Sequence, residues 1–286
     1  MKFLIIGDLH GNVPEIYFED FDAIIAPGDF CSDAPRKYMF QALKLNLENP
    51  KSKIQWYDLA GKKNAKEMIK KSVQDGRKIL EKLNGIGVPV YVVPGNWDYA
   101  ESNKTGWKEA NKVYWKSLKK GLKNIIDVHQ KIINIGDYQI IGHGITSGPE
   151  YPQQELKNYT KSELKIKKIE YLKMYKKIDL LFSKAKKLVI FMPHNVPYNT
   201  PLDKIVNPAS PRNGQHFGSL IARQMIDRYH PLVCIGGHMH EHFRSYKMGK
   251  TTAINAGFGS YVNVLLEIYG NKIRRLEFHK GKKHKH

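Results

Sequence analysis

The sequence predicts an α/β fold, and three observations support this prediction. Five short apolar runs have the length of β-strands, and each is followed by Gly or Pro and then by Asp, Asn or His. Between the runs lie segments whose apolar residues recur every third or fourth position, as in amphipathic helices. The chain has 286 residues, of which 41% are hydrophobic, so it can bury a sizeable core as one large α/β domain or two small ones.

The apolar runs place polar side chains just beyond their ends. The first run, residues 3–6, is followed by Asp8 and His10, and the second, residues 22–26, is followed by Asp29. The third, residues 90–93, is followed by Asn96 and Asp98. The fourth, residues 188–191, is followed by His194, and the fifth, residues 232–235, by His238 and His240. In an α/β sheet, ligands bind in the crevice beyond the carboxyl ends of the strands. We therefore expect these side chains to share one pocket.

The remaining elements follow from periodicity and from turn residues. Helices are predicted over residues 36–47, 65–83, 107–122, 160–187 and 219–229, and strands over 131–135, 138–141, 262–269 and 272–279. Gly136-Asp137 predicts a tight hairpin between the first two of these strands. Residues 54–57 and 61–63 are expected to form a loop or lid. Residues 195–218, rich in Pro, Asn and Gly, predict a long loop that is functional or disordered.

The charge balance indicates the kind of partner. The chain carries 47 Lys and Arg against 27 Asp and Glu, a formal net charge of +20. This favours anionic partners, which include phosphorylated small molecules, nucleic acid and acidic proteins. In the predicted helix 160–187, we interpret the lysines as a solvated face over a buried apolar stripe, and a nucleic-acid groove is the alternative. The basic tail, residues 280–286, is expected to be disordered.

The cysteines and the hydropathy pattern indicate the compartment. Cys31 and Cys234 form no disulfide or metal-binding pattern, so we expect two small buried hydrophobes in a reducing environment. The chain starts with a predicted strand, and its apolar runs are too short to cross a bilayer. We therefore expect no signal peptide, no membrane partner and a cytoplasmic location. The sequence predicts no particular oligomeric state.

The polar residues beyond the strands have the chemistry of metal ligands. Carboxylates, an amide and imidazoles together suit Mn, Fe, Zn or Ni. Two such ions held roughly 3.5–4 Å apart need a ligand between them, and a carboxylate is the natural bridge. We expect Asp29 to be that bridge.

Five motifs carry a resemblance to a known family. They are Gly7-Asp8-Leu9-His10, Gly28-Asp29, Gly95-Asn96-Trp97-Asp98, the His194 that precedes Asn-Val-Pro, and Gly237-His238-Met239-His240. Each is weak alone, but their joint occurrence resembles the calcineurin-like metallophosphoesterases over residues 1 to about 270. The resemblance implies a four-layer α/β/β/α sandwich of two mixed sheets, and we expect a single domain over residues 1–279.

The resemblance also implies a dinuclear metal centre. Carried over to this sequence, one metal would be held by Asp8, His10, Asp29 and His240, and the other by Asp29, Asn96, His194 and His238. A hydroxide between the metals would attack phosphorus in line, while the cations neutralise the phosphoryl oxygens. Such chemistry needs no nucleophilic side chain. Consistently, the sequence has no GxSxG motif and no P-loop.

One position departs from the family pattern. Most members have a histidine by the leaving-group oxygen where this chain has Trp97, and an indole cannot donate a titrating proton. We expect Trp97 to pack against a substrate group or a lid, and leaving groups of low pKa to be preferred. Asp98 is assigned an orienting role near the metals. His143 is a candidate replacement for the lost acid, although Gly142-His143-Gly144 could equally be a turn.

Two further residues are candidates for substrate binding. His216 could meet a phosphate together with the amides of the helix after it, although a plain loop histidine is the simpler interpretation. Asn12 could approach substrate oxygens, and turn chemistry explains it equally well.

Together these features predict a di-metal-dependent phosphoesterase that favours phosphodiesters, with manganese among the suitable ions. A nuclease acting on DNA or RNA is one alternative, supported by the net charge. A non-catalytic binding module on the same fold is the other.

Overall fold

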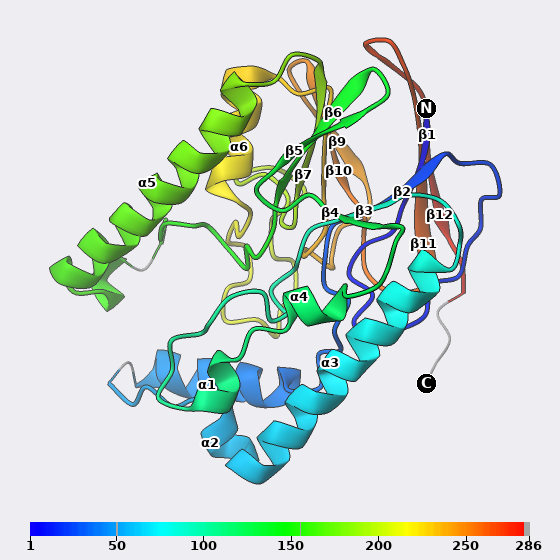
Figure 1. Ribbon diagram of the computed structural model, residues 1–286. Coiled ribbons are helices and arrows are strands. Elements are labelled where there is room, and N and C mark those ends of the chain that lie inside the picture. The colour runs from blue at the N-terminus through cyan, green and yellow to red at the C-terminus, as the bar shows by residue number, and fades with distance from the viewer. Residues whose placement is uncertain (50, 155, 283–286) are drawn as a thin grey trace.

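The computed structural model describes residues 1–49, 51–154 and 156–282, and two six-stranded sheets form its centre (Figure 1). The first sheet has the order β12 (Lys272–Lys280), β11 (Val262–Tyr269), β1 (Lys2–Ile5), β2 (Ala23–Ala26), β3 (Val90–Val92) and β4 (Ile125–Asp127). Strands β1 to β4 are mutually parallel, β11 is antiparallel to β1, and β12 is antiparallel to β11. The first sheet is therefore mixed.

The second sheet is also mixed. Its order is β5 (Ile132–Ile135), β6 (Tyr138–His143), β7 (Leu188–Pro193), β8 (Val233–Gly236), β10 (Thr251–Asn255) and β9 (Ser245–Met248). Strands β6, β7, β8 and β10 run parallel, and β5 and β9 add antiparallel edges. The carboxyl ends of the parallel strands carry the loops on which the functional residues lie.

Helices cover the outer faces of both sheets. The helices are α1 (Arg36–Glu48), α2 (Trp56–Ala60), α3 (Lys62–Asn84), α4 (Trp115–Leu118), α5 (Lys161–Ser183) and α6 (Leu220–Tyr229), with short 3₁₀ turns at Lys108–Asn111 and Leu156–Asn158. Helices α3 and α4 pack on the first sheet, and α5 and α6 pack on the second (Figure 1). The four layers confirm the predicted α/β/β/α sandwich.

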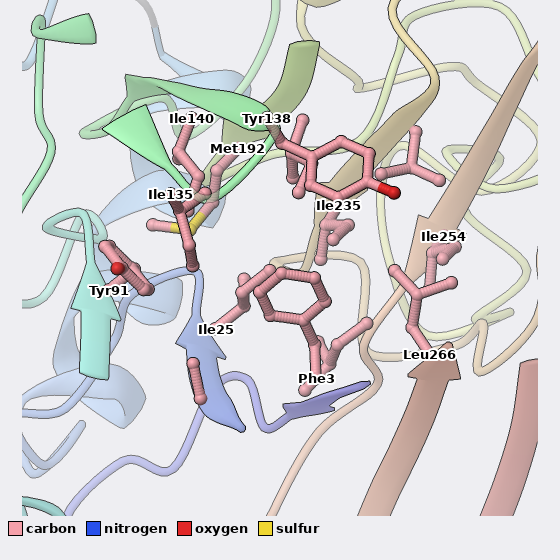
Figure 2. Packing of buried hydrophobic residues seen from close by; sticks show 14 of the residues in the cluster. Phe3, Ile25, Tyr91, Ile135, Tyr138, Ile140, Met192, Ile235, Ile254 and Leu266 are labelled. Carbon is pink, nitrogen blue, oxygen red and sulfur yellow. The ribbon is translucent and has the colours of Figure 1, made fainter. Parts of the chain in front are cut away.

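The core between the sheets explains why the strands are apolar on both faces. Phe3, Ile25 and Leu266 of the first sheet point toward Met192 and Ile235 of the second, and all five are fully buried (Figure 2). The alternate residues of the same strands lie under the helices instead. Strands buried on both sides have near-continuous hydrophobic runs, which is why the five runs could be found in the sequence.

Two predicted segments are wrong. Residues 54–57 and 61–63, expected as loop or lid, contain α2 and the start of α3, and the two helices are separated by Gly61 at φ 76°. The Gln55 and Asp58 side chains form a reciprocal N-terminal cap for α2. The helix expected over residues 107–122 is a 3₁₀ turn followed by α4, because only a few side chains, such as Trp115 and Leu118, reach the core.

The third long helix, α5, is placed correctly, and the apolar stripe expected on it is buried only in part. Ile178 and Phe182 of that stripe are buried, and so is Tyr171, whereas Ile169 and Leu172 of the stripe are exposed. Strands β4, β9 and β10 were not predicted.

The C-terminal tail was predicted to be disordered from residue 280. Lys280 is instead the last residue of β12, and residues 283–286 lie outside the described residues.

Two expectations about the core and the hydropathy can be compared directly with the structure. Cys31 and Cys234 are free and buried, as predicted. Within the described ranges, no helix has the length and apolar character needed to cross a membrane.

Candidate metal centre

The predicted ligands lie on the loops that leave β1, β2, β3, β7 and β8. Asp8, His10, Asp29 and His238 have positive φ angles of 49°, 45°, 57° and 67°. Such angles cost a non-glycine residue about 1–3 kcal/mol and persist only where the surroundings enforce them. Here backbone hydrogen bonds join the loops, from Asp8 N–H to Gly28 O (3.2 Å) and from His10 N–H to Asp29 O (2.8 Å). The loops after β1 and β2 therefore form one rigid unit.

Two glycines give the carboxylates room. A Cβ atom at Gly95 would lie 2.1 Å from Asp29 Oδ1, and one at Gly237 would lie 2.3 Å from Asp8 Oδ2. Both distances are far below van der Waals contact, so any other residue would displace the carboxylate. The glycines of these two motifs are thus required by the close approach of the backbone to the side chains.

The structure brings all seven predicted ligands together. Ligand atoms of Asp8, His10 and His240 lie within 4.8 Å of one another, and those of Asp29, His194 and His238 form a second such group. Asn96 Oδ1 lies 3.0 Å from His194 Nε2 and so joins the second group.

Asp29 lies between the two groups. Its Oδ2 atom is 3.4 Å from His194 Nε2 in the second group and 3.7 Å from His10 Nε2 in the first. Its other oxygen, Oδ1, accepts a hydrogen bond from Trp97 N–H (2.8 Å), which leaves Oδ2 to face both groups. This is the position that a bridging ligand requires.

The unpaired atoms of the site fit divalent cations. Asp8 Oδ1, His10 Nδ1 and Asp29 Oδ2 are buried without a hydrogen-bond partner. Buried polar atoms are almost always paired, and an unpaired buried carboxylate oxygen is especially costly, so a cation is the natural partner. The donor set of carboxylates, one amide and imidazoles suits Mn, Fe, Ni or Zn.

Three of the four histidine rings at the site, those of His10, His238 and His240, are uncharged near neutral pH. Burial lowers the pKa of His10 and His240, and burial with the nearby His194 lowers the pKa of His238 to about 3. Their rings are therefore neutral near pH 7, which leaves a lone pair for a metal. His194 Nδ1 donates to Pro27 O at 2.8 Å, which points Nε2 toward Asp29 and Asn96.

The carboxylates and His194 compensate one another without a cation. Burial opposes a charge on His194, but the adjacent Asp29 and Asp8 carboxylates outweigh it and raise its pKa to about 9. In turn, the His194 charge holds the pKa of Asp29 below its usual range despite burial. Burial raises the pKa of Asp8.

Asp98 lies behind the ligands and joins two of their loops. Its fully buried carboxylate accepts hydrogen bonds from the backbone N–H groups of Asp29, Phe30, Cys31 and Gly95, all at 2.8–2.9 Å. Burial and the Asp29 charge raise the pKa of Asp98 to about 6, and the amide hydrogen bonds oppose this shift. Through these contacts Asp98 holds the loop that carries Asp29 against the loop that carries Asn96.

Trp97 lies beside the metal ligands. Its ring meets that of His10 edge-on, with centroids 6.2 Å apart. It lines a cavity of about 170 Å³ together with Pro35, Met39 and Trp56, which belong to the region of α1 and α2. Trp97 therefore lies between this cavity and the hydrophobic cluster under α3 and α4.

The other candidate residues have partners within the protein. His143 is 2% exposed, ends β6, and its Nε2 lies 3.1 Å from Glu150 Oε1, so it is not in a turn. Asn12 donates its amide hydrogens to Leu9 O and His10 O, which favours the turn explanation.

His216 is oriented by a carboxylate. Its Nδ1 lies 2.7 Å from Asp203 Oδ1, and its side chain is about one quarter exposed at 28%. The N–H groups of Leu220 and Ile221 at the start of α6 already bond Glu150, which favours the interpretation of His216 as a plain loop histidine.

Sequence reasoning missed one ring at the site. Phe258 stacks on His240 with centroids 4.0 Å apart and meets His10 edge-on at 5.3 Å. It follows β10, whose apolar run ends at Asn255, Ala256 and Gly257. The strand-then-glycine pattern that located the other loops could have located this one.

Solved structures share this fold. One crystal structure has 17% sequence identity, covers 98% of both chains and gives a TM-score of 0.58. The crystal structure of TT1561 of Thermus thermophilus has 16% identity, 98% coverage of both chains and a TM-score of 0.53. Phosphopantetheinyl hydrolase (PptH) from Mycobacterium tuberculosis has 12% identity, covers 90% of this chain and 89% of its own, and gives a TM-score of 0.52. At such identities the likeness establishes the fold alone.

Sequence comparison identifies the family. No curated protein sequence matches the chain at a significant level. A sequence model of the calcineurin-like phosphoesterases matches residues 1–242, which include all seven predicted ligands. The chain therefore belongs to the calcineurin-like phosphoesterase family.

Proposed function

We propose that the protein is a di-metal-dependent phosphoesterase that favours phosphodiesters. The observation that carries the proposal is the position of Asp29 Oδ2, which is unpaired, buried and close to both groups of ligands. One ion would be held by Asp8, His10, Asp29 and His240, and the other by Asp29, Asn96, His194 and His238. Bound ions would supply Lewis-acid activation of water and neutralise charge on the phosphoryl oxygens.

The chain's own residues orient and enclose these ligands. The Trp97 amide fixes one oxygen of Asp29, Pro27 O fixes the His194 ring, and Phe258 covers the rings of His10 and His240. Orientation by such contacts contributes to metal affinity as well as to geometry.

The expected preference among leaving groups rests on Trp97. Trp97 occupies the position next to Asn96 and offers no proton that titrates near neutral pH. His143, the other candidate acid, has Nε2 against Glu150. Without a general acid, leaving groups of low pKa are favoured, and aryl esters should react faster than alkyl esters.

Replacing Trp97 with His is expected to raise the rate for alkyl phosphodiesters selectively. General acid catalysis contributes typically about 10²–10⁴-fold, so we expect a gain of roughly tenfold or more for methyl esters and little change for aryl esters. The measurement is kcat/KM of Trp97→His and of Trp97→Phe on a matched alkyl and aryl pair. An equal change for both substrates, or a gain with Phe, would contradict the proposed preference.

Hydrolysis of a chromogenic aryl phosphodiester tests the function itself. We expect turnover with Mn²⁺ or another suitable ion and loss of turnover after treatment with EDTA. Two bound metals without turnover under several divalent ions would indicate a binding module. Nucleic-acid binding that weakens steeply with salt, together with cleavage, would indicate a nuclease instead.

A further inference from the structure

A second cavity lies next to the metal centre and has no role in the chemistry described so far. Its volume is about 430 Å³, which is within the usual range for small-molecule sites of roughly 300–1,000 Å³. It lies between residues 143–154, the N-terminal half of α5 and residues 212–217, and we call it the side pocket. In Figure 1, α5 and the chain just before it (green) form this flank of the molecule.

The side pocket and the metal centre share walls. Ser147 lines the side pocket, and its carbonyl oxygen lies 3.2 Å from Nε2 of the predicted ligand His238. Glu101 and Ile145 line both the side pocket and the smaller cavity that contains Asn96 and Trp97. A substrate whose phosphorus lies at the metal centre therefore has a neighbouring space for its remaining part.

The wall between the two cavities is strained and fixed. Ile145 has φ 75°, which is an outlier for a β-branched residue, and its N–H donates to Pro94 O at 2.8 Å. Gly144 packs so closely that a Cβ atom would lie 2.3 Å from the same oxygen. Strain of this kind persists where the surroundings enforce it and is concentrated at functional sites. The contacts hold the loop after β6 against the loop that carries Asn96.

Two of the three described carboxylates that line the side pocket, Glu150 and Glu170, have partners within the protein. Glu150 accepts hydrogen bonds from Ser219 Oγ and from the N–H groups of Leu220 and Ile221, and also contacts His143. Glu170 pairs with Lys104. The third carboxylate, Glu101, lies exposed at the edge that the side pocket shares with the smaller cavity.

Two basic side chains that line the pocket, Arg212 and Lys167, have no carboxylate partner among the described residues. Arg212 lies over the Phe217 ring at 4.3 Å, and its Nε is buried without a hydrogen-bond partner. Lys167 Nζ lies 5.3 Å from the centre of the Tyr159 ring. Among the residues that the structure describes, neither cation has a carboxylate within 4 Å. A buried guanidinium nitrogen without an acceptor indicates that an anionic ligand group is missing there.

We propose that the side pocket binds a second anionic group, a phosphate or a carboxylate, on the part of the substrate away from the reacting phosphoester. Arg212 and Lys167 bind this group, and His216, held by Asp203, lies at the same wall. The inference rests on the proposed function, because it assigns the reacting phosphate to the metal centre. The substrate class is a small phosphoester with two separated anionic ends.

Competition with simple bifunctional chains tests this inference. Alkane-diol bisphosphates of three to eight carbons are compared with alkyl monophosphates of equal length as inhibitors of aryl phosphodiester turnover. One charge-assisted contact is worth about tenfold in affinity, so at the best length we expect the bisphosphate to bind at least tenfold tighter. Phosphate esters ending in a carboxylate form a parallel series that distinguishes the two anions.

Variants assign the preference to the side pocket. Arg212→Gln and, independently, Lys167→Gln are expected to reduce the ratio of bisphosphate to monophosphate affinity to about one third or less of its wild-type value, since each removes a charge-assisted contact. Lys173→Gln is the matched control, because Lys173 is exposed on the same helix and does not line the pocket. The control should keep the wild-type ratio. An unchanged ratio in both pocket variants, or no preference in the wild type, would overturn the inference.

Calorimetry with the same compounds separates this inference from the proposed function. If the aryl diester is not hydrolysed by the metal-loaded protein, but the bisphosphate still binds in a manner that depends on Arg212, the proposed function fails and the anion site stands. If the diester is hydrolysed and the ratio does not depend on Arg212 and Lys167, the site fails and the function stands.

Discussion

Replacing Asp29 with Asn is expected to lower kcat/KM by roughly 10³-fold or more, because metal stabilisation of transition-state charge is worth several kcal/mol and each 1.36 kcal/mol is tenfold. Asp29 Oδ2 is the atom that lies close to both groups of ligands. An amide in its place either loses the oxygen facing one group or loses its hydrogen bond from Trp97 N–H. The expected metal content falls below two per chain, which metal analysis of the purified variant measures.

Asp137→Asn is the matched control for this change. It removes the same charge from an exposed turn between β5 and β6, away from the ligands. The control should retain both metals and the wild-type rate. If Asp29→Asn kept two metals and its activity, the bridging role would be wrong. Circular dichroism of both variants establishes that the comparison is between folded proteins.

Asp98→Asn is expected to reduce the free energy of unfolding by about 2–4 kcal/mol, since each buried donor left without an acceptor costs about 1–3 kcal/mol. The carboxylate accepts four backbone N–H groups, two on each oxygen. An amide side chain can accept only on one oxygen, so its NH₂ group must face two of these donors. The loops that carry Asp29 and Asn96 would then separate.

Two measurements test whether Asp98 positions the loops that carry Asp29 and Asn96. Urea unfolding of Asp98→Asn and of the Asp137→Asn control gives the change in stability, and titration with Mn²⁺ gives the change in affinity. We expect affinity to fall about 10- to 100-fold, as for other residues that orient metal ligands. A variant as stable as the control, with unchanged affinity, would show that Asp98 does not hold the two loops together.

The metal centre could be predicted from the sequence because its determinants are local. Each ligand follows a doubly buried strand, which leaves a continuous apolar run, and each turn contains a glycine or proline. The glycines at positions 95 and 237 are required by carboxylate oxygens that approach the backbone. Local signals of this kind survive without knowledge of the tertiary structure.

Other elements could not be predicted because tertiary contacts define them. Strand β4 has only three residues, and the Trp115 ring before it stacks on Phe30 and donates its N–H to Asp127. In α5, the apolar residues surround the helix, so periodicity identified only part of the buried face. Ile166 and Ile169 are exposed while Tyr171 and Ile178 are buried.

The side pocket was missed for the same reason. Glu150 and Arg212 lie in irregular segments and line the same cavity only because β6, α5 and α6 pack together. A glutamate that accepts hydrogen bonds from the start of a helix 70 residues later leaves no pattern in the sequence. His216 was identified, but its partner Asp203 was not.

Anomalous diffraction from crystals grown with Mn²⁺ tests most directly whether two cations share Asp29. The account predicts two peaks roughly 3.5–4 Å apart, one among Asp8, His10 and His240 and the other among Asn96, His194 and His238, with Asp29 in contact with both. A single peak, or two peaks of which only one contacts Asp29, would contradict it.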